Sequence, residues 1–196
     1  MKLSALTTTR RGRVALAAVP TLTAVGVLTG GVAQGAVPVS FAVAGQEFKI
    51  AATSLDGEGF SQYAGVAKDA EGAEHPVAIA NISQATLHDL CQSVKVPGAD
   101  LGLMISAGTD PEHPVTATDL QIGMSDLQGT ATFADIRIGV DASTVGTQAK
   151  GTAGDFAMDS DTIAIQDLKQ VSLSTSAAVF NLNGLHLRLT DGEECF

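Results

Sequence analysis

Apolar and polar side chains alternate over long stretches of this chain. Residues 115–140 carry aliphatic side chains two residues apart, as at Leu120, Ile122 and Met124. Two residues is the period at which the side chains of a β-strand return to the same face of a sheet. No segment has a sustained apolar stripe at helical spacing. The pattern therefore predicts a chain built mainly of strands.

The strictest alternation lies near the C-terminus. Leu185, Leu187 and Leu189 alternate with His186 and Arg188. In a strand, the three leucines would share one face of the sheet, and His186 and Arg188 would share the other, solvated face. This stretch is the clearest predicted strand of the chain.

Glycine and polar clusters predict where the strands are interrupted. Residues 37–55 are expected to form a strand, a turn and a second strand. Residues 56–59, Asp-Gly-Glu-Gly, are typical of a further turn, after which 60–68 returns as the second arm of a hairpin. Residues 141–155 are rich in Gly, Ser, Thr and Ala and are expected to form the longest loop. Residues 83–94 are the one candidate for a short helix.

Two short motifs recur along the chain. Glu-His-Pro-Val occurs at 74–77 and again at 112–115, and Asp-Leu occurs at 89–90, 126–127 and 167–168. The separations are close to 40 residues, which indicates a degenerate structural repeat. Such a repeat leaves a β-solenoid open as an alternative architecture.

An all-β fold follows from these patterns. Long, flat strands with unpaired edges would pair with other chains, which folded proteins avoid. A curved antiparallel sheet or a β-sandwich is therefore the expected architecture, with the β-solenoid as the alternative. We expect one β-rich extracellular domain over residues 36–196, which is long enough to bury a core.

The N-terminus has the features of a signal peptide. Residues 1–13 are basic, and 14–32 are nearly free of charge. Ala33 and Gly35 then predict cleavage after residue 35, and Ala42-Val43-Ala44 offers a later site. The alternative is an uncleaved N-terminal membrane anchor, since this apolar stretch is just long enough to span a bilayer. We expect a protein that is secreted or displayed at the cell surface.

Two cysteines remain after that segment, Cys91 and Cys195. An even number of cysteines in an exported chain most simply indicates a disulfide between them. The bond would tie the C-terminal tail to the middle of the fold. A catalytic thiol is the weaker interpretation, because it would need a partner that lowers the pKa of the cysteine.

Charge restricts the classes of partner. The chain has 11 basic and 21 acidic residues, a net charge of −10, and loss of residues 1–35 removes four bases and no acid, which leaves −14. Such a surface repels phosphate backbones, so nucleic acid is not an expected partner. Anionic headgroups are disfavoured for the same reason.

Catalytic motifs are incomplete. Gly123-Met124-Ser125-Asp126-Leu127 approaches the Gly-x-Ser-x-Gly nucleophile elbow of hydrolases, but Leu127 stands where the second glycine belongs. Ser125 is therefore the one candidate nucleophile, and we expect no assembled catalytic machinery.

Metal and cofactor motifs are also weak. Asp155, Asp159 and Asp161 offer oxygen ligands for Ca²⁺ without the spacing of an EF-hand loop, so a solvated acidic loop is favoured. The histidines are too dispersed to indicate zinc. No cofactor is expected.

The chain resembles an uncharacterised family of exported actinobacterial proteins. The resemblance rests on the basic, alanine-rich leader, the Phe-x-x-x-Gly segment at Phe41–Gly45, the Asp-Leu strands and the final Cys195-Phe196. Some members of that family are labelled cholesterol esterase, and their genes are paired with that of a small multi-span membrane protein. The resemblance implies a role at the cell envelope.

These observations predict a non-enzymatic domain that binds a partner protein or an apolar ligand such as a lipid. An aliphatic sheet with few aromatic residues can enclose a lipid chain between its strands. A lipid-ester hydrolase that uses Ser125 is one alternative. The other is a structural envelope protein that associates with itself through the edges of its sheet.

Overall fold

The alternating segments form nine β-strands. The structure is a computed structural model, and it describes residues 46–69 and 72–196, which belong to a unit spanning Ala42–Phe196. The predicted signal peptide over 1–35 and the alternative cleavage site at 42–44 lie outside the described residues. The strands are β1 (Phe48–Lys68), β2 (Glu74–His88), β3 (Leu90–Lys95), β4 (Gly102–Ala107), β5 (Val115–Ala134), β6 (Arg137–Asp141), β7 (Phe156–Ser176), β8 (Val179–Asn181) and β9 (His186–Thr190).

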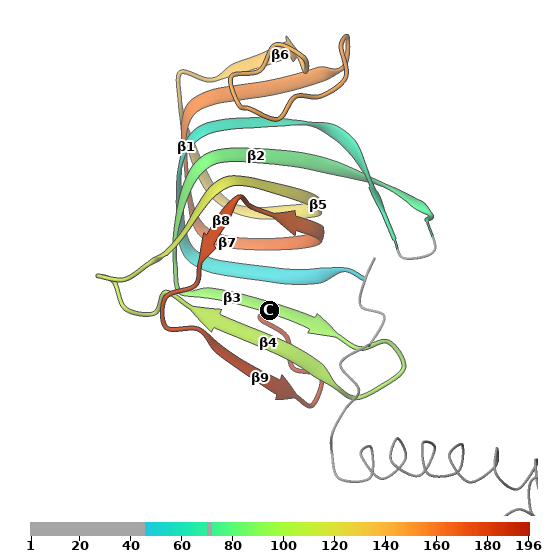
Figure 1. The fold of residues 1–196 in the computed structure, drawn as a ribbon, viewed down its shortest axis with the longest axis vertical. Helices are drawn as coiled ribbons and strands as arrows, with labels where there is room; N and C mark the ends of the chain where they lie inside the picture. The colour runs from blue at the N-terminus through green and yellow to red at the C-terminus, as the bar shows by residue number, and fades with distance from the viewer. Residues whose placement is uncertain (1–45, 70–71) are drawn as a thin grey trace, which may run out of the picture. The chain divides into compact units, whose positions relative to one another are not determined.

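The nine strands make one antiparallel sheet, as Figure 1 shows. Their order is β6-β7-β5-β2-β1-β3-β4-β9, β8 pairs with β5, and β7 also pairs with β1. The all-β prediction and the curved antiparallel sheet are confirmed. A β-solenoid stacks parallel strands from successive coils. The solenoid alternative is therefore wrong for the part of the chain that the structure describes.

The predicted hairpin around residues 56–59 is wrong, because β1 runs through this segment without a turn. Gly57 is fully part of the strand and pairs with Ala85 on β2 and Ile163 on β7. A Cβ atom at this glycine would lie 2.7 Å from Cγ2 of Ile82 and 2.9 Å from Cγ2 of Ile163. Gly57 thus serves close packing between strands and not chain reversal.

The predicted short helix over residues 83–94 is also wrong. This segment forms the end of β2 and most of β3. Its apolar residues Leu87 and Leu90 are 4% and 2% exposed in the core cluster. They lie three residues apart, as on a helix, because Asp89 between them interrupts the alternation of the strand.

Asp89 belongs to a set of aspartates with left-handed backbone. Among the described residues, every non-glycine residue with positive φ is an aspartate followed by Leu or Ile. They are Asp89 (φ 53°), Asp119 (φ 48°), Asp135 (φ 53°) and Asp167 (φ 54°). Aspartate tolerates this conformation better than most residues because its short side chain can form local hydrogen bonds. The Asp-Leu pairs at 89–90 and 167–168 thus mark interruptions of the strand pattern and not coils of a solenoid, whereas Asp126, in the remaining pair of the repeat, does not have positive φ.

These aspartates lie on two lines that cross the sheet. Asp119 on β5 and Gly59 on β1 (φ 64°) both lie opposite Ser83 on β2, because the residues on either side of them pair in that register. On the second line, Asp89 and Asp167 flank Thr53 of β1, whose Oγ1 donates to Oδ2 of Asp89 at 2.9 Å. A left-handed residue redirects a strand. We infer that these lines produce the sharp turns that the long strands make together along one side of Figure 1.

The core fills the inside of the bent sheet. It consists of aliphatic side chains from β1, β2, β3, β5 and β7, with Phe60 as its buried aromatic residue, whose ring centroid lies 5.6 Å from that of Phe133. Ser125 and the rest of β5 beyond it are largely exposed. The predicted long loop is confirmed, because β6 ends at Asp141 and β7 begins at Phe156.

Three short strands extend the sheet beyond β1. β3 pairs with β1 through three residue pairs, β4 pairs with β3, and β9 pairs with β4. We call β3, β4 and β9 the wing (Figure 1). The predicted strand near the C-terminus is confirmed as β9. Within 46–69 and 72–196, the structure has no helix with the length and apolarity to span a membrane.

Candidate functional site

Ser125, the candidate nucleophile, lies within β5 and is exposed. Its Oγ donates a hydrogen bond to Oε1 of Glu47 at 3.1 Å. No histidine of the described residues is hydrogen-bonded to it. The strand continues to Ala134, whereas a nucleophile elbow places its serine on a sharp turn between a strand and a helix. The structure therefore brings no base to Ser125 beyond this glutamate.

Of the three aspartates considered as metal ligands, Asp159 and Asp161 line one hollow together with Arg137, and Asp155 does not line it. Asp159 is 4% exposed and bonded to Arg137 of β6, with Nε of Arg137 2.9 Å from Oδ1. Asp155 lies at the end of the loop, and Asp161 is exposed. No group of three or more His, Cys, Asp or Glu side chains placed to hold a metal ion occurs in the described part of the chain.

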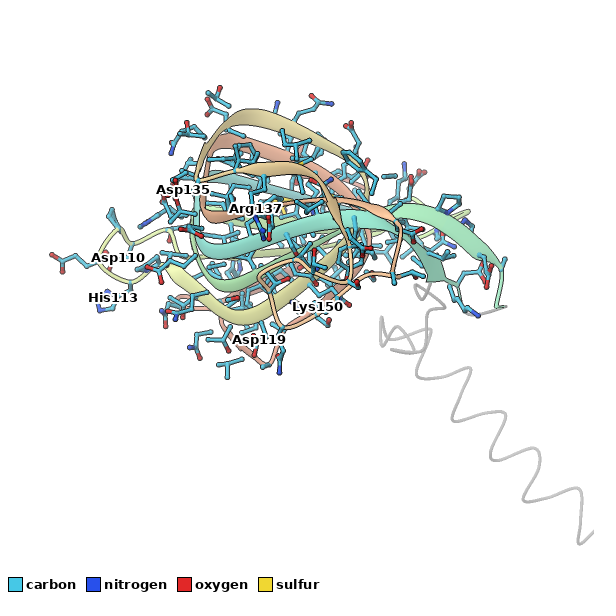
Figure 2. The ribbon with its side chains drawn as sticks, turned by 90° about the horizontal axis from the view of Figure 1, so that it is seen from above. Asp110, His113, Asp119, Asp135, Arg137 and Lys150 are labelled. Carbon is cyan, nitrogen blue, oxygen red and sulfur yellow. A yellow bond between two sulfur atoms is a disulfide. The ribbon has the colours of Figure 1, made fainter. Side chains whose placement is uncertain are left out.

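Asp159 instead fastens the loop over residues 142–155 to the sheet. Its Oδ2 accepts a hydrogen bond from the backbone N–H of Gly146 at 2.8 Å. Burial acts to raise the pKa of Asp159, but the hydrogen bonds from Arg137 and Gly146 and the charges of Arg137 and Lys150 lower it further than burial raises it. The pKa of Arg137 is raised in turn, chiefly by its hydrogen bond to Asp159. Figure 2 shows Asp135 and Arg137 near one another, with Lys150 on the loop.

A chain of polar side chains crosses the sheet beneath the same loop. Gln121 Nε2 donates to Asn81 Oδ1 at 2.9 Å, and Asn81 Nδ2 donates to Ser61 Oγ at 3.2 Å. Ser61 Oγ lies 2.5 Å from Oγ1 of Thr147, which donates to the carbonyl of Ala149. Ser61, Asn81 and Thr147 are 0%, 4% and 3% exposed. This chain satisfies buried polar groups and holds the loop in place. The sequence gives no signal for it, since its members are 20 to 86 residues apart.

The two Glu-His-Pro-Val segments each place a histidine beside an aspartate. His75 Nε2 lies 3.0 Å from Asp69 Oδ2, and His113 Nδ1 lies 2.8 Å from Asp110 Oδ2. The His113 side chain, followed by the N–H of Glu112, lowers the pKa of Asp110. Figure 2 shows Asp110 and His113 on a loop that projects away from Arg137 and Lys150. His75 belongs to β2 and His113 to the loop before β5, and neither histidine is hydrogen-bonded to Ser125.

The predicted disulfide is present and covers one face of the wing. Cys91 on β3 is bonded to Cys195 with an S–S distance of 1.99 Å. The N–H of Cys195 donates to Oγ of Ser93 at 3.0 Å, and Lys49 forms an ion pair with Glu194 at 3.1 Å. Because Ser93 pairs with Met104 and Met104 with Arg188, these side chains share one face. The tail over residues 191–196 lies on this face.

The opposite face of the wing is aliphatic. One row of cross-strand neighbours runs from Val94 through Leu103 to Leu189, and the next pairs Ile105 with Leu187. We call these five residues the aliphatic face. Leu187 and Leu189 are 55% and 57% exposed, and the other three are half-buried. Leu185, which precedes β9, is 53% exposed. Alternation correctly predicted that the leucines share a face, but that face is open to solvent.

The interior of the sheet leaves little room for a ligand. A cavity of about 20 Å³ lies among core residues that include Leu55, Leu120 and Leu168. Thr175 also lines it, and its Oγ1 is the one buried side-chain polar atom without a hydrogen-bond partner among the described residues. A cavity of this size holds about one water molecule. It is far smaller than the roughly 300–1,000 Å³ of ordinary ligand pockets.

A larger hollow lies beside the loop. It measures about 170 Å³ and is lined by Asn81, Gln121, Thr147 and Gln148 among others. Asn81, Gln121 and Thr147 already belong to the hydrogen-bonded chain that holds the loop. These hydrogen bonds account for the position of the loop. The side chains that line the hollow do not assemble a nucleophile with a base, or a set of metal ligands.

Comparison with known proteins identifies a family but no activity. No curated protein and no solved structure matches the chain significantly. One family model, described as a family of unknown function (DUF6230), matches residues 44–196. This match includes all nine strands, both cysteines and the aliphatic face. The chain therefore belongs to the DUF6230 family.

Proposed function

We propose that this protein is a non-enzymatic β-domain, secreted or held at the cell envelope, that binds a partner through the aliphatic face of the wing. The observation that carries this proposal is the exposure of Leu187 and Leu189 on one side of β9, with Leu185 exposed just before the strand. Isolated exposed leucines are common, but a contiguous apolar patch on a soluble domain marks an interaction surface. The patch is unusual here because the chain is otherwise acidic, with a net charge of −10.

The surface supports a partner that contacts the protein from outside. A partner protein or the surface of an apolar ligand such as a lipid can cover the aliphatic face directly. A lipid chain held between the strands fits less well, because the interior cavity of about 20 Å³ is smaller than such a chain requires. The resemblance to exported actinobacterial proteins, whose genes are paired with that of a membrane protein, supports an envelope partner.

Export is part of the proposal and rests on two features. The first is the basic and then apolar N-terminal segment over residues 1–35, with small residues before the expected cleavage site. The second is the bond between Cys91 and Cys195, since disulfides persist in oxidising compartments.

The test is native mass spectrometry of the full chain purified from its own host. We expect a bound partner or lipid on the wild-type protein and its loss on Leu187→Lys. Ile138→Lys is the matched control, since Ile138 is 66% exposed on β6, at the far end of the sheet order from β9. A wild-type protein that carries nothing, or a partner retained equally by both variants, would contradict the proposal.

A lipid-ester hydrolase is the second candidate, favoured by the cholesterol esterase label of the family that the chain resembles. In this function Ser125 Oγ would attack the ester carbonyl to form an acyl-enzyme, and Glu47, 3.1 Å away, would accept the serine proton and pass it to the departing alcohol. Water would then hydrolyse the acyl-enzyme and release the acid. Incubation with short-chain and long-chain acyl esters tests it. We expect no turnover above that of Ser125→Ala. Turnover that Ser125→Ala abolishes and Ser174→Ala, an exposed serine on β7, leaves intact would replace the binding proposal.

A further inference from the structure

We propose that a second copy of this chain binds at the β9 edge of the aliphatic face, by antiparallel pairing of the two β9 strands about Leu187. This inference rests on the proposed function and names its partner. The two wings would become one continuous sheet, with β9 of each copy side by side at its centre. The leucines of both copies would then lie on the same face.

β9 is a short sheet edge that carries one charged side chain, Arg188, but no bulge and no proline. It ends the strand order and pairs with β4 alone among the described strands. Proteins normally protect such an edge with a bulge, a proline or charges. β6, the edge at the other end of the sheet order, has these protections: Gly139 with φ 83° interrupts its register, and Arg137 is bound to Asp159. β9 has five residues in regular register and no bulge.

The sequence of β9 is complementary to itself in the antiparallel sense. If Leu187 of one copy lies opposite Leu187 of the other, Leu185 lies opposite Leu189, and His186 lies opposite Arg188. Every leucine thus meets a leucine on the aliphatic face. Shifting the register by one residue would put the leucines of one copy beside the polar residues of the other, on the wrong face. A shift by two residues would keep the faces matched but leave one leucine of each copy without a leucine opposite it. The register centred on Leu187 is therefore the one in which all three leucines of each copy meet a leucine.

The net negative charge of the chain opposes pairing at β9 less than it opposes contacts elsewhere on the surface. Two acidic copies repel one another in general. On β9 itself the charged residue is Arg188, and its Nη2 is paired with Oε2 of Glu193 in the same copy at 3.0 Å. The edge strand presents no uncompensated carboxylate of its own to a second copy.

The size of the contact predicts a weak dimer. A stable interface buries about 800 Å² on each partner. Five paired residues and the exposed parts of three leucines supply only part of that area. We therefore expect a dissociation constant of roughly 1–100 µM, so that the dimer forms at high local concentration.

Sedimentation velocity of the full chain over a concentration series tests the association. We expect wild-type protein to pass from one copy to two as its concentration rises. Leu187→Lys places two like charges directly opposite one another and should raise the dissociation constant about tenfold or more. Ile138→Lys should leave it unchanged. Chains that stay single at every concentration, or an equal effect of the two substitutions, would overturn the inference.

Cross-linking tests the register. Residues directly opposite in an antiparallel pair have Cα atoms about 4.5–5.5 Å apart, within the range that a disulfide spans. Leu187→Cys should therefore form an intermolecular disulfide with itself. Leu185→Cys alone should not, because the two copies of residue 185 would be about 14 Å apart along the strands at 3.4 Å per residue. A mixture of Leu185→Cys and Leu189→Cys should cross-link. Equal cross-linking of all these variants would contradict the proposed pairing.

The outcomes separate this inference from the proposed function. If the chain stays single while Leu187→Lys loses a bound lipid or a different protein in native mass spectrometry, the aliphatic face is still a binding surface and only the identity of the partner is wrong. If Leu187→Lys changes neither association nor bound mass, both proposals fail.

Discussion

The left-handed aspartates lead to a prediction that tests the origin of the bends in the sheet. Asp167 has φ 54° within β7, and its side chain is exposed. In this conformation the Cβ of an ordinary residue lies too close to the following carbonyl oxygen, which costs about 1–2 kcal/mol. Aspartate offsets part of this cost through local hydrogen bonds, which alanine cannot form. We therefore expect Asp167→Ala to lower the free energy of unfolding by about 1 kcal/mol.

Two further substitutions at Asp167 test whether the left-handed backbone causes this loss of stability. Asp167→Asn keeps the short hydrogen-bonding side chain and should change stability by less than about 0.5 kcal/mol. Asp167→Gly removes the Cβ but enlarges the conformational freedom of the unfolded chain, so the two effects should nearly cancel. Alanine should therefore be the worst of the three, although alanine is usually the most innocuous substitution.

The assay is urea unfolding of wild type and variants at one pH. The slope of the transition should stay constant while its midpoint falls for Asp167→Ala, and the melting temperature should fall by about 2–4 °C. Asp126→Ala is the matched control, because Asp126 is an exposed aspartate before a leucine on a strand but does not have positive φ. Equal losses at Asp167 and Asp126, or glycine more destabilising than alanine at Asp167, would refute the explanation of the bends.

Three other predictions follow from contacts described above. Joint replacement of Cys91 and Cys195 by serine should lower the free energy of unfolding by about 4–5 kcal/mol, since the bond joins residues 104 apart, and denaturant titration checks this. Gly57→Ala should cost about 1–3 kcal/mol by overpacking against neighbours 2.7 and 2.9 Å away, and a melting temperature equal to that of wild type would contradict it. Because the pKa of Asp159 is lowered in the folded protein, its ionised carboxylate stabilises the fold at pH values above the ordinary pKa of 3.8. This contribution is lost as the pH falls through the folded-state pKa. Asp159→Asn should therefore be less stable than wild type at pH 7, and the difference should shrink in acid when both are unfolded at pH 7 and pH 2.

Sequence reasoning predicted the elements whose signal is local. The alternation of leucines with His186 and Arg188 correctly predicted β9, because side-chain period depends only on the strand itself. The parity of the cysteines correctly predicted the bond between Cys91 and Cys195. The exposure of Leu187 was not predictable, since burial depends on whether another layer covers the strand.

The errors arose where distant segments decide the structure. Gly57 has the composition of a turn, but its role is set by Ile82 and Ile163 on two other strands. The Asp-Leu motif was detected as a repeat, and its meaning as a left-handed interruption depends on backbone angles that no spacing reveals. The chain of hydrogen bonds from Gln121 to Thr147 forms only when β1, β2 and β5 pair in the observed registers, which no local sequence pattern determines.

The pairing of β1 with β7 has a consequence for how the chain reaches its native state. Phe48 pairs with Ser172, so one side of β1 gains its neighbour β7 only after more than a hundred further residues have been made. At bacterial and eukaryotic synthesis rates of about 5–20 residues per second, this interval is roughly 6–25 s. During that time a 21-residue strand has an unpaired side that is open to wrong partners. Nascent chains should therefore depend on a holding chaperone, and refolding from denaturant should be slow and sensitive to protein concentration.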